Sequence, residues 1–96
     1  MTAQTQSANP HLDLKVKVTF PITKKGPFLA EFPADTTAGV VLADAKTYFG
    51  VQDDSQFIYV LSHDGEEVDD PSVTIGSLAG HAHDVRFTLV KKITQG

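Results

Sequence analysis

Residues 12–20 read LDLKVKVTF, an unbroken alternation of apolar and polar side chains. One side of an extended chain would carry the apolar members, Leu12, Leu14, Val16, Val18 and Phe20. The other side would carry the polar members, Asp13, Lys15, Lys17 and Thr19. A period of two is typical of a strand that buries only one face. This segment therefore predicts a half-buried β-strand.

A turn and a second apolar segment follow this strand directly. Lys24-Lys25-Gly26-Pro27 has the residue types of a turn, and residues 28–32 mix apolar and polar side chains over the length of a strand. Pro33 has no amide hydrogen to donate to a strand ladder, so it ends the second strand. The first third of the chain therefore predicts a β-hairpin.

A helix is predicted after the hairpin. Residues 35–37, Asp-Thr-Thr, offer side-chain oxygens to the free amides at a helix start. Gly50 lies where a left-handed C-terminal cap is expected. Between these ends the apolar face of the helix would consist of Val41, Ala45, Tyr48 and Phe49.

The second half of the chain predicts three more strands. Residues 57–61 are a continuous apolar run, 66–68 can form a short returning strand, and 85–90 alternate again, while 73–78 suit one helical turn. The order β-β-α-β-β-β defines an α+β domain in which a mixed sheet packs on one helix. With the first and last long strands parallel at the sheet centre, and the helix crossing over them, this arrangement is the β-grasp.

Length and composition restrict the class of protein. A chain of 96 residues with no Cys and a net charge of −4 has room for one domain, and it lacks thiolate metal sites, disulfides and cysteine nucleophiles. The negative balance argues against a nucleic-acid partner. The sequence has neither an apolar run of about 20 residues nor a start of signal-peptide type, so we expect a cytoplasmic protein without a membrane partner.

The element order and several short segments resemble ubiquitin and its relatives. Pro33-Ala34-Asp35-Thr36 is similar to the Pro-x-Asp-Thr segment with which ubiquitin enters its helix, and residues 74–78 are similar to its Thr-Leu-x-x-Tyr turn. The composition resembles a divergent, bacterial member. The resemblance implies a ubiquitin-like β-grasp domain over residues 12–90. Polar residues 1–11 are expected to form a flexible N-terminal tail, and residues 91–96 an extended C-terminal tail.

The resemblance gives Gly96 a function. Members of this family that are conjugated to targets end in a glycine carboxylate, which an activating enzyme adenylates in a narrow channel where a Cβ would collide. Here Gln95 precedes Gly96, whereas family modifiers usually end in Gly-Gly. A modifier joined through Gly96 is therefore one hypothesis, and a glycine without this function is its alternative.

A recognition surface is the second expectation. If residues 57, 59 and 61 point into the core, alternation places neighbouring side chains on the outer face of the sheet. This surface resembles the exposed aliphatic patch of ubiquitin and would bind partner proteins through Ile58, Val60, Arg86, Thr88 and Val90. The alternatives are the opposite register and coverage of the patch by the N-terminal tail.

The remaining polar clusters indicate ordinary surface. His81 and His83 could contribute to a metal site, but two imidazoles in a loop are too few. The acidic run 64–70 lacks calcium-loop spacing, and residues 62–64, Ser-His-Asp, are too close in sequence to converge as a triad. We therefore expect no catalytic residue, no metal and no cofactor.

Three functions follow as hypotheses. The first is a monomeric ubiquitin-like protein recognised by partner proteins, either activating and conjugating enzymes or a ubiquitin-fold-binding domain, and conjugated through Gly96. The second is an adaptor that is not conjugated. The third is a sulfur carrier whose C-terminal glycine becomes a thiocarboxylate. In none of them is the protein itself an enzyme.

Overall fold

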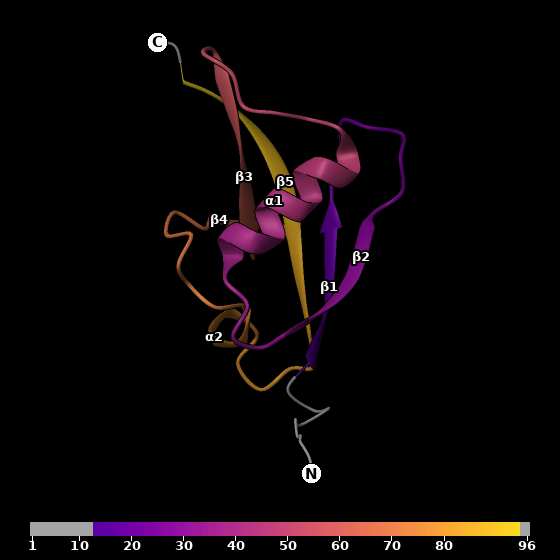
Figure 1. The fold of residues 1–96 in the computed structure, drawn as a ribbon, viewed down its shortest axis with the longest axis vertical. Helices are drawn as coiled ribbons and strands as arrows, with labels where there is room; N and C mark the ends of the chain where they lie inside the picture. Colours follow the sequence, from indigo (N-terminus) through magenta and orange to yellow (C-terminus); the bar gives the residue numbers. More distant parts are fainter. Residues whose placement is uncertain (1–12, 95–96) are drawn as a thin grey trace.

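The computed structural model of this protein describes residues 13–94. Figure 1 shows its elements, which are β1 (Asp13–Thr19), β2 (Phe28–Pro33), α1 (Ala38–Phe49), β3 (Phe57–His63), β4 (Glu66–Glu67), α2 (Ile75–Ala79) and β5 (Asp84–Ile93). The α+β class and the predicted strand order are confirmed. The segment 1–11, expected to be a flexible tail, lies outside the described residues.

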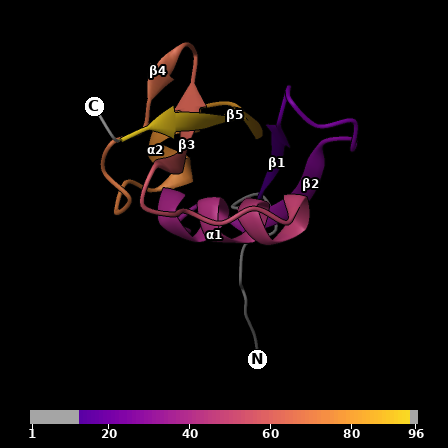
Figure 2. The ribbon, with the colours of Figure 1, turned by 90° about the horizontal axis from the view of Figure 1, so that it is seen from above.

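The five strands form one mixed sheet in the order β2-β1-β5-β3-β4. The first and last long strands, β1 and β5, lie side by side and parallel in its interior, with Val16 opposite Val85. All other neighbouring strands are antiparallel. Figure 2 shows α1 lying across one face of this sheet, so the sheet has an inner face under the helix and an outer face turned away from it.

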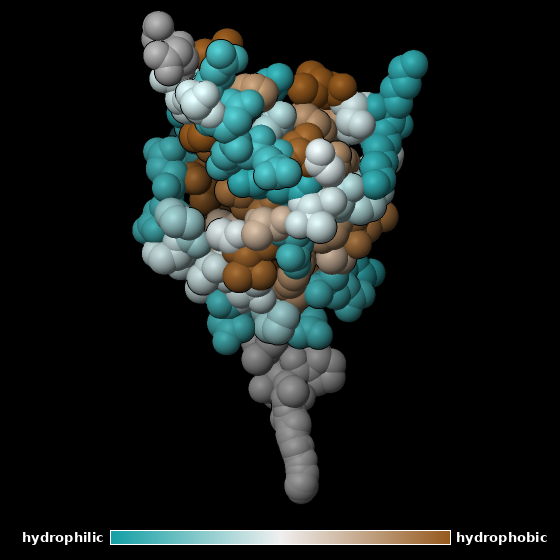
Figure 3. Space-filling view, turned by 45° about the horizontal axis from the view of Figure 1, so that its top comes forward, coloured by the Kyte–Doolittle hydropathy of each residue, from teal (hydrophilic) through white to brown (hydrophobic). Residues whose placement is uncertain are grey.

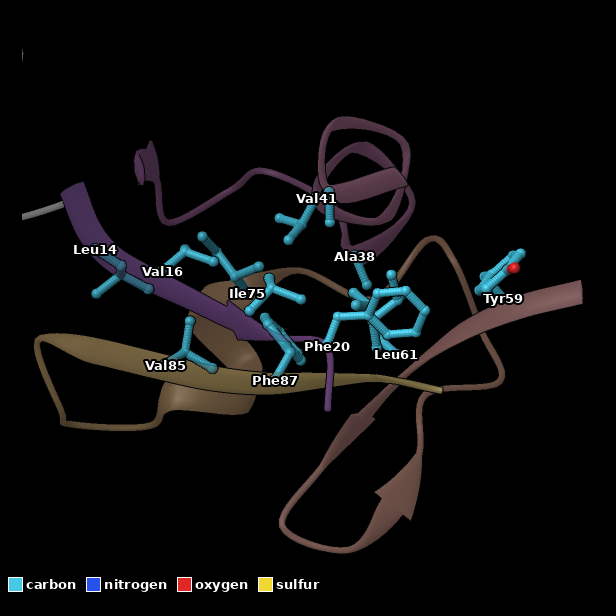
Figure 4. Packing of buried hydrophobic residues seen from close by; sticks show 13 residues of the cluster. Leu14, Val16, Phe20, Ala38, Val41, Tyr59, Leu61, Ile75, Val85 and Phe87 are labelled. Carbon is cyan, nitrogen blue, oxygen red and sulfur yellow. The ribbon is translucent and has the colours of Figure 1, made fainter. Parts of the chain in front are cut away.

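The alternation of β1 and β5 puts their apolar side chains on the inner face. Val16, Val18, Phe87 and Leu89 are among the most deeply buried residues, and α1 covers them with Ala38, Val41 and Ala45, all buried. Figure 4 shows Ala38 and Val41 pointing from the helix toward the sheet, and Ile75 of α2 lying close to Val16 and Phe87. Small alanines on the covering helix allow it to approach the sheet closely.

The start of α1 differs from the prediction. Thr37 is the N-cap residue, but no side chain caps the helix. Instead the amides of Ala38 and Gly39 donate to the carbonyl oxygens of Val73 at 2.7 Å and Pro71 at 2.9 Å. Backbone carbonyls far along the chain therefore satisfy the amides that residues 35–37 were expected to satisfy, a tertiary contact that local sequence does not reveal.

The last strand is also longer than predicted. It continues through Ile93, three residues past Val90, because the polar residues there have partners on neighbouring strands. The Lys91 ammonium lies 3.9 Å from the centre of the Phe57 ring, and Lys92 Nζ lies 2.8 Å from Glu67 Oε1. The Thr94 amide donates to Gln56 O at 2.9 Å. Residues 91–93 are thus part of the sheet and not an extended tail, and residues 95–96 lie outside the described residues.

Candidate protein-docking surface

The outer face of β3 and β5 carries the residues predicted for partner binding. Val60 and Val90 lie directly opposite each other. The next pair on the same face, two residues away along each strand, is Ile58 and Lys92. The inward positions Tyr59 and Leu61 are buried, as the predicted register requires. We call the residues Ile58, Val60, Thr88 and Val90, all half-buried, together with the exposed Arg86, the β3–β5 surface.

An ion pair crosses this surface. Lys92 on β5 and Glu67 on β4 lie on opposite sides of β3, so their 2.8 Å contact spans the strand on the side where Val60 points outward. The hydrogen bond to Glu67, together with its negative charge, raises the pKa of Lys92 above the ordinary lysine value. The aliphatic part of the Lys92 side chain can cover Val60 while the ammonium stays at the surface. The ion pair therefore borders the aliphatic residues of the β3–β5 surface.

The polar end of the β3–β5 surface is a row of hydroxyl groups and a cation. Thr88 lies between Ser62 of β3 and Thr19 of β1, all on the outer face. Arg86, the next outward residue of β5, has a side chain that is 79% exposed, with its Nε 3.9 Å from Asp84 Oδ2. This contact is at the limit of an ion pair, so the guanidinium keeps most of its hydrogen-bonding capacity for a partner.

The outer face also contains a groove that the sequence did not identify. It lies over β2, β1 and β5, has a volume of about 400 Å³ and includes Lys15 and Lys17 together with Leu29 and Arg86. Alternation alone placed the two lysines on the outer face of the first strand. The groove itself depends on which β2 and β5 residues lie beside them, and that register is a property of the folded sheet.

The other predicted positions do not join this surface. His81 and His83 are exposed in the loop before β5, and within residues 13–94 no group of three or more His, Asp or Glu side chains gathers as a metal site. Gly96 lies outside the described residues. Of the two described helices, neither has the length and apolar character needed to cross a membrane.

The helix side of the molecule offers a different surface. Figure 3 shows apolar side chains reaching that surface in separate patches between hydrophilic ones. Val40 is the one large hydrophobic residue of α1 that is exposed. On the opposite side, Val60 and Val90 lie directly across from each other, so two partly exposed aliphatic side chains adjoin there.

Comparison with known proteins supports the fold. No protein-family model and no curated protein matches the sequence. Among solved structures, Caldiarchaeum subterraneum ubiquitin superposes with a TM-score of 0.68 and 21% identity over 88% of this chain and 99% of that chain. The UBL domain of yeast Ddi1 gives 0.63 and 17% over 88% of this chain and 95% of that one. A chain from a structure described as molecular mimicry of SUMO gives 0.61 and 17% over 86% and 96%.

These similarities confirm that the chain has the ubiquitin-like β-grasp fold, as its segments predicted. At such identities a structural match shows the fold alone, and one fold serves many functions. The matched proteins give no support to a bacterial source for this chain.

Proposed function

We propose that this protein is a recognition module that docks a partner protein on its β3–β5 surface. The observation that carries the proposal is the pair Val60 and Val90, which face each other on the side of the sheet turned away from α1. Partly exposed aliphatic side chains beside Arg86 and Thr88 give an apolar centre with a polar rim, the usual composition of a protein interface. The module acts as a monomer, is not an enzyme, and meets its partners in the cytoplasm.

Site-specific photo-crosslinking tests this proposal. A benzoylphenylalanine at position 88, on the outer face, should capture a discrete partner from a lysate of the source cells. The same probe at position 44, exposed on α1, serves as the control. Val60→Asp should abolish capture from position 88, because a carboxylate in an apolar contact loses its hydration without gaining a partner. Equal capture from both positions, or capture that survives Val60→Asp in a folded variant, would contradict the proposal.

Conjugation through Gly96 is the second candidate. It is supported by the accessibility of the end of β5, because Ile93, the last residue of this strand, is 78% exposed. Glycine at the reacting carboxylate suits a narrow activating channel, as argued from the sequence.

Mass spectrometry distinguishes the conjugated protein from its alternatives. Incubation with ATP and cell lysate should give an adenylate, a thioester on a partner's cysteine, or an isopeptide at Gly96, and a variant lacking Gly96 is the control. An adaptor would keep its crosslinked partner after Gly96 is removed and would show none of these adducts. A sulfur carrier would instead exchange one carboxylate oxygen for sulfur.

A further inference from the structure

The groove over β2, β1 and β5 adjoins the β3–β5 surface but has a different chemistry. Its walls are long side chains that rise from the outer face of three strands, namely Lys15, Lys17, Leu29, Glu31, Asp84 and Arg86. We call it the basic groove, because of the cationic row described next. With about 400 Å³ it is large enough to take several side chains of an extended segment.

Two neighbouring rows of the basic groove differ in the charges that the register places side by side. Lys15 lies between Glu31 of β2 and Asp84 of β5, so two carboxylates flank its charge. Lys17, one row further along β1, lies between Leu29 and Arg86.

The second row therefore holds two cations side by side and no carboxylate. Like charges at directly neighbouring positions destabilise a sheet, by an amount comparable to the roughly 0.2–1 kcal/mol that a favourable pair contributes. Within residues 13–94, the only ion pair of Arg86 is with Asp84 on the same strand, and its Nε lies 3.9 Å from Asp84 Oδ2. A carboxylate supplied from outside would relieve this repulsion.

The surroundings of the cationic row suit a peptide more than a free ion. Leu29 on one side is 67% exposed, an apolar contact for an aliphatic side chain. On the other side, a second hollow of about 380 Å³ shares Lys17 and Arg86 and includes the hydroxyl-bearing residues Thr19, Ser62 and Thr88, with Asp64 of the β3–β4 turn also in its lining. The row thus combines two cations, hydroxyl groups and an apolar contact within one continuous surface.

We propose that the basic groove binds an acidic peptide segment of the partner protein. Its carboxylates would accept hydrogen bonds from Lys17 Nζ and the Arg86 guanidinium, while an aliphatic side chain packs on Leu29. The inference rests on the proposed function, since the same partner would place an apolar anchor on Val60 and Val90. Val90 lies four positions after Arg86 on β5, so anchor and carboxylates should lie about 13 Å apart.

The overall charge makes this assignment selective. The protein carries a net charge of −4, and the acidic residues Glu66, Glu67, Asp69 and Asp70, which line a different hollow, would repel an acidic ligand there. The cationic row is the local exception on the outer face. It would fix the register of the partner more than it would add to the affinity.

An NMR titration tests the proposal with two synthetic peptides. Both are extended ten-residue peptides with one Leu as anchor, and one carries three consecutive Glu residues where the other carries Gln. The Glu peptide should shift the amide signals around Lys17 and Arg86 and bind at least about tenfold more tightly than the Gln peptide. Lys17→Glu should weaken its binding about tenfold or more, whereas Lys24→Glu, the same charge change in the exposed turn before β2, should change it less than about twofold.

Three results would overturn the inference. The first is equal affinity for the Glu and Gln peptides. The second is an equal loss of affinity for the Glu peptide in Lys17→Glu and Lys24→Glu. The third is displacement of the Glu peptide by a short single-stranded DNA at a concentration below that of the peptide. The outcome also separates this inference from the proposed function. If Val60→Asp removes the crosslinked partner while Lys17→Glu leaves both partner and peptide binding intact, the docking surface stands and the basic groove does not.

Discussion

At the scale of single residues, Gly76 shows how tightly α2 packs on the chain that leads into α1. Its amide donates to Ala34 O at 2.8 Å, and a Cβ at this position would lie 2.8 Å from that oxygen and 3.0 Å from Ala34 Cβ. Gly76→Ala should therefore lower the free energy of unfolding by about 1–3 kcal/mol through overpacking. Urea denaturation measures this change. Gly26→Ala, which would meet no atom within 4 Å, is the matched control and should stay within about 0.5 kcal/mol of the parent protein.

Asp70 makes a pH-dependent contribution of its own. Its Oδ1 accepts hydrogen bonds from the Ser72 hydroxyl at 2.6 Å and the Ser72 amide at 2.9 Å. These bonds lower the pKa of Asp70 below its usual value of 3.8. A carboxylate with a depressed pKa stabilises the fold above the unfolded value, and this stability is lost as pH falls through the folded value.

Asp70→Asn should therefore lower the thermal midpoint at pH 7, and the difference from the parent protein should shrink as pH falls from about 4 to about 2. Thermal melts followed by circular dichroism at both ends of this range measure the effect. Asp44→Asn, at an exposed position on α1, controls for the loss of one negative charge. A difference that stayed constant with pH would show that the hydrogen bonds of Asp70 do not depend on its ionisation.

At the scale of elements, the end of β5 depends on contacts across the sheet. Lys92 pairs with Glu67 on the far side of β3, and the Thr94 amide donates to Gln56 O just beyond. Lys92→Glu would place two carboxylates where the ion pair was, so the strand end should fray. The Thr94 amide should then exchange with solvent about five- to tenfold faster, while the amide of Val16 in the centre of the sheet keeps its rate. Lys24→Glu should change neither rate, and hydrogen exchange followed by NMR measures all of them.

The same elements show how far the sequence predicts this fold. The alternation in β1 and β5 predicts both strands and their buried faces, because a period of two needs no knowledge of partners. The end of β5 was placed too early, since Lys91 and Lys92 look like solvent-exposed tail until Phe57 and Glu67 lie beside them. The partners of Lys91 and Lys92 lie far away in the sequence, so the local pattern cannot show that these lysines belong to a strand.

The candidate site could also be predicted only in part. Alternation within each strand is enough to place Val60 and Val90 on the outer face. It did not reveal that Lys17 adjoins Arg86, because these residues are brought together by the parallel register of β1 and β5. Cationic side chains on separate half-exposed strands look like ordinary surface until the register is known.

At the scale of the whole molecule, one core is shared by both helices and by every strand except the short, exposed β4, and Ile75 shows this most directly. Helix α2 spans only Ile75–Ala79, too short to be stable alone, yet its Ile75 is completely buried in the core shared by the sheet and α1. Ile75→Ala should cost about 2–5 kcal/mol, a large part of the 5–15 kcal/mol that stabilises an ordinary domain.

Because α2 has no core of its own, the loss should appear as destabilisation of the whole domain and not as local melting of one segment. Far-ultraviolet circular dichroism and tyrosine fluorescence should therefore give coincident urea transitions, both shifted to lower concentration. Ile22→Ala, at an isoleucine that is 68% exposed, removes the same atoms from the surface and should shift the midpoint little. Transitions that separate in Ile75→Ala would mean that α2 and the loops around it unfold independently, and the sheet with α1 would then be the cooperative unit.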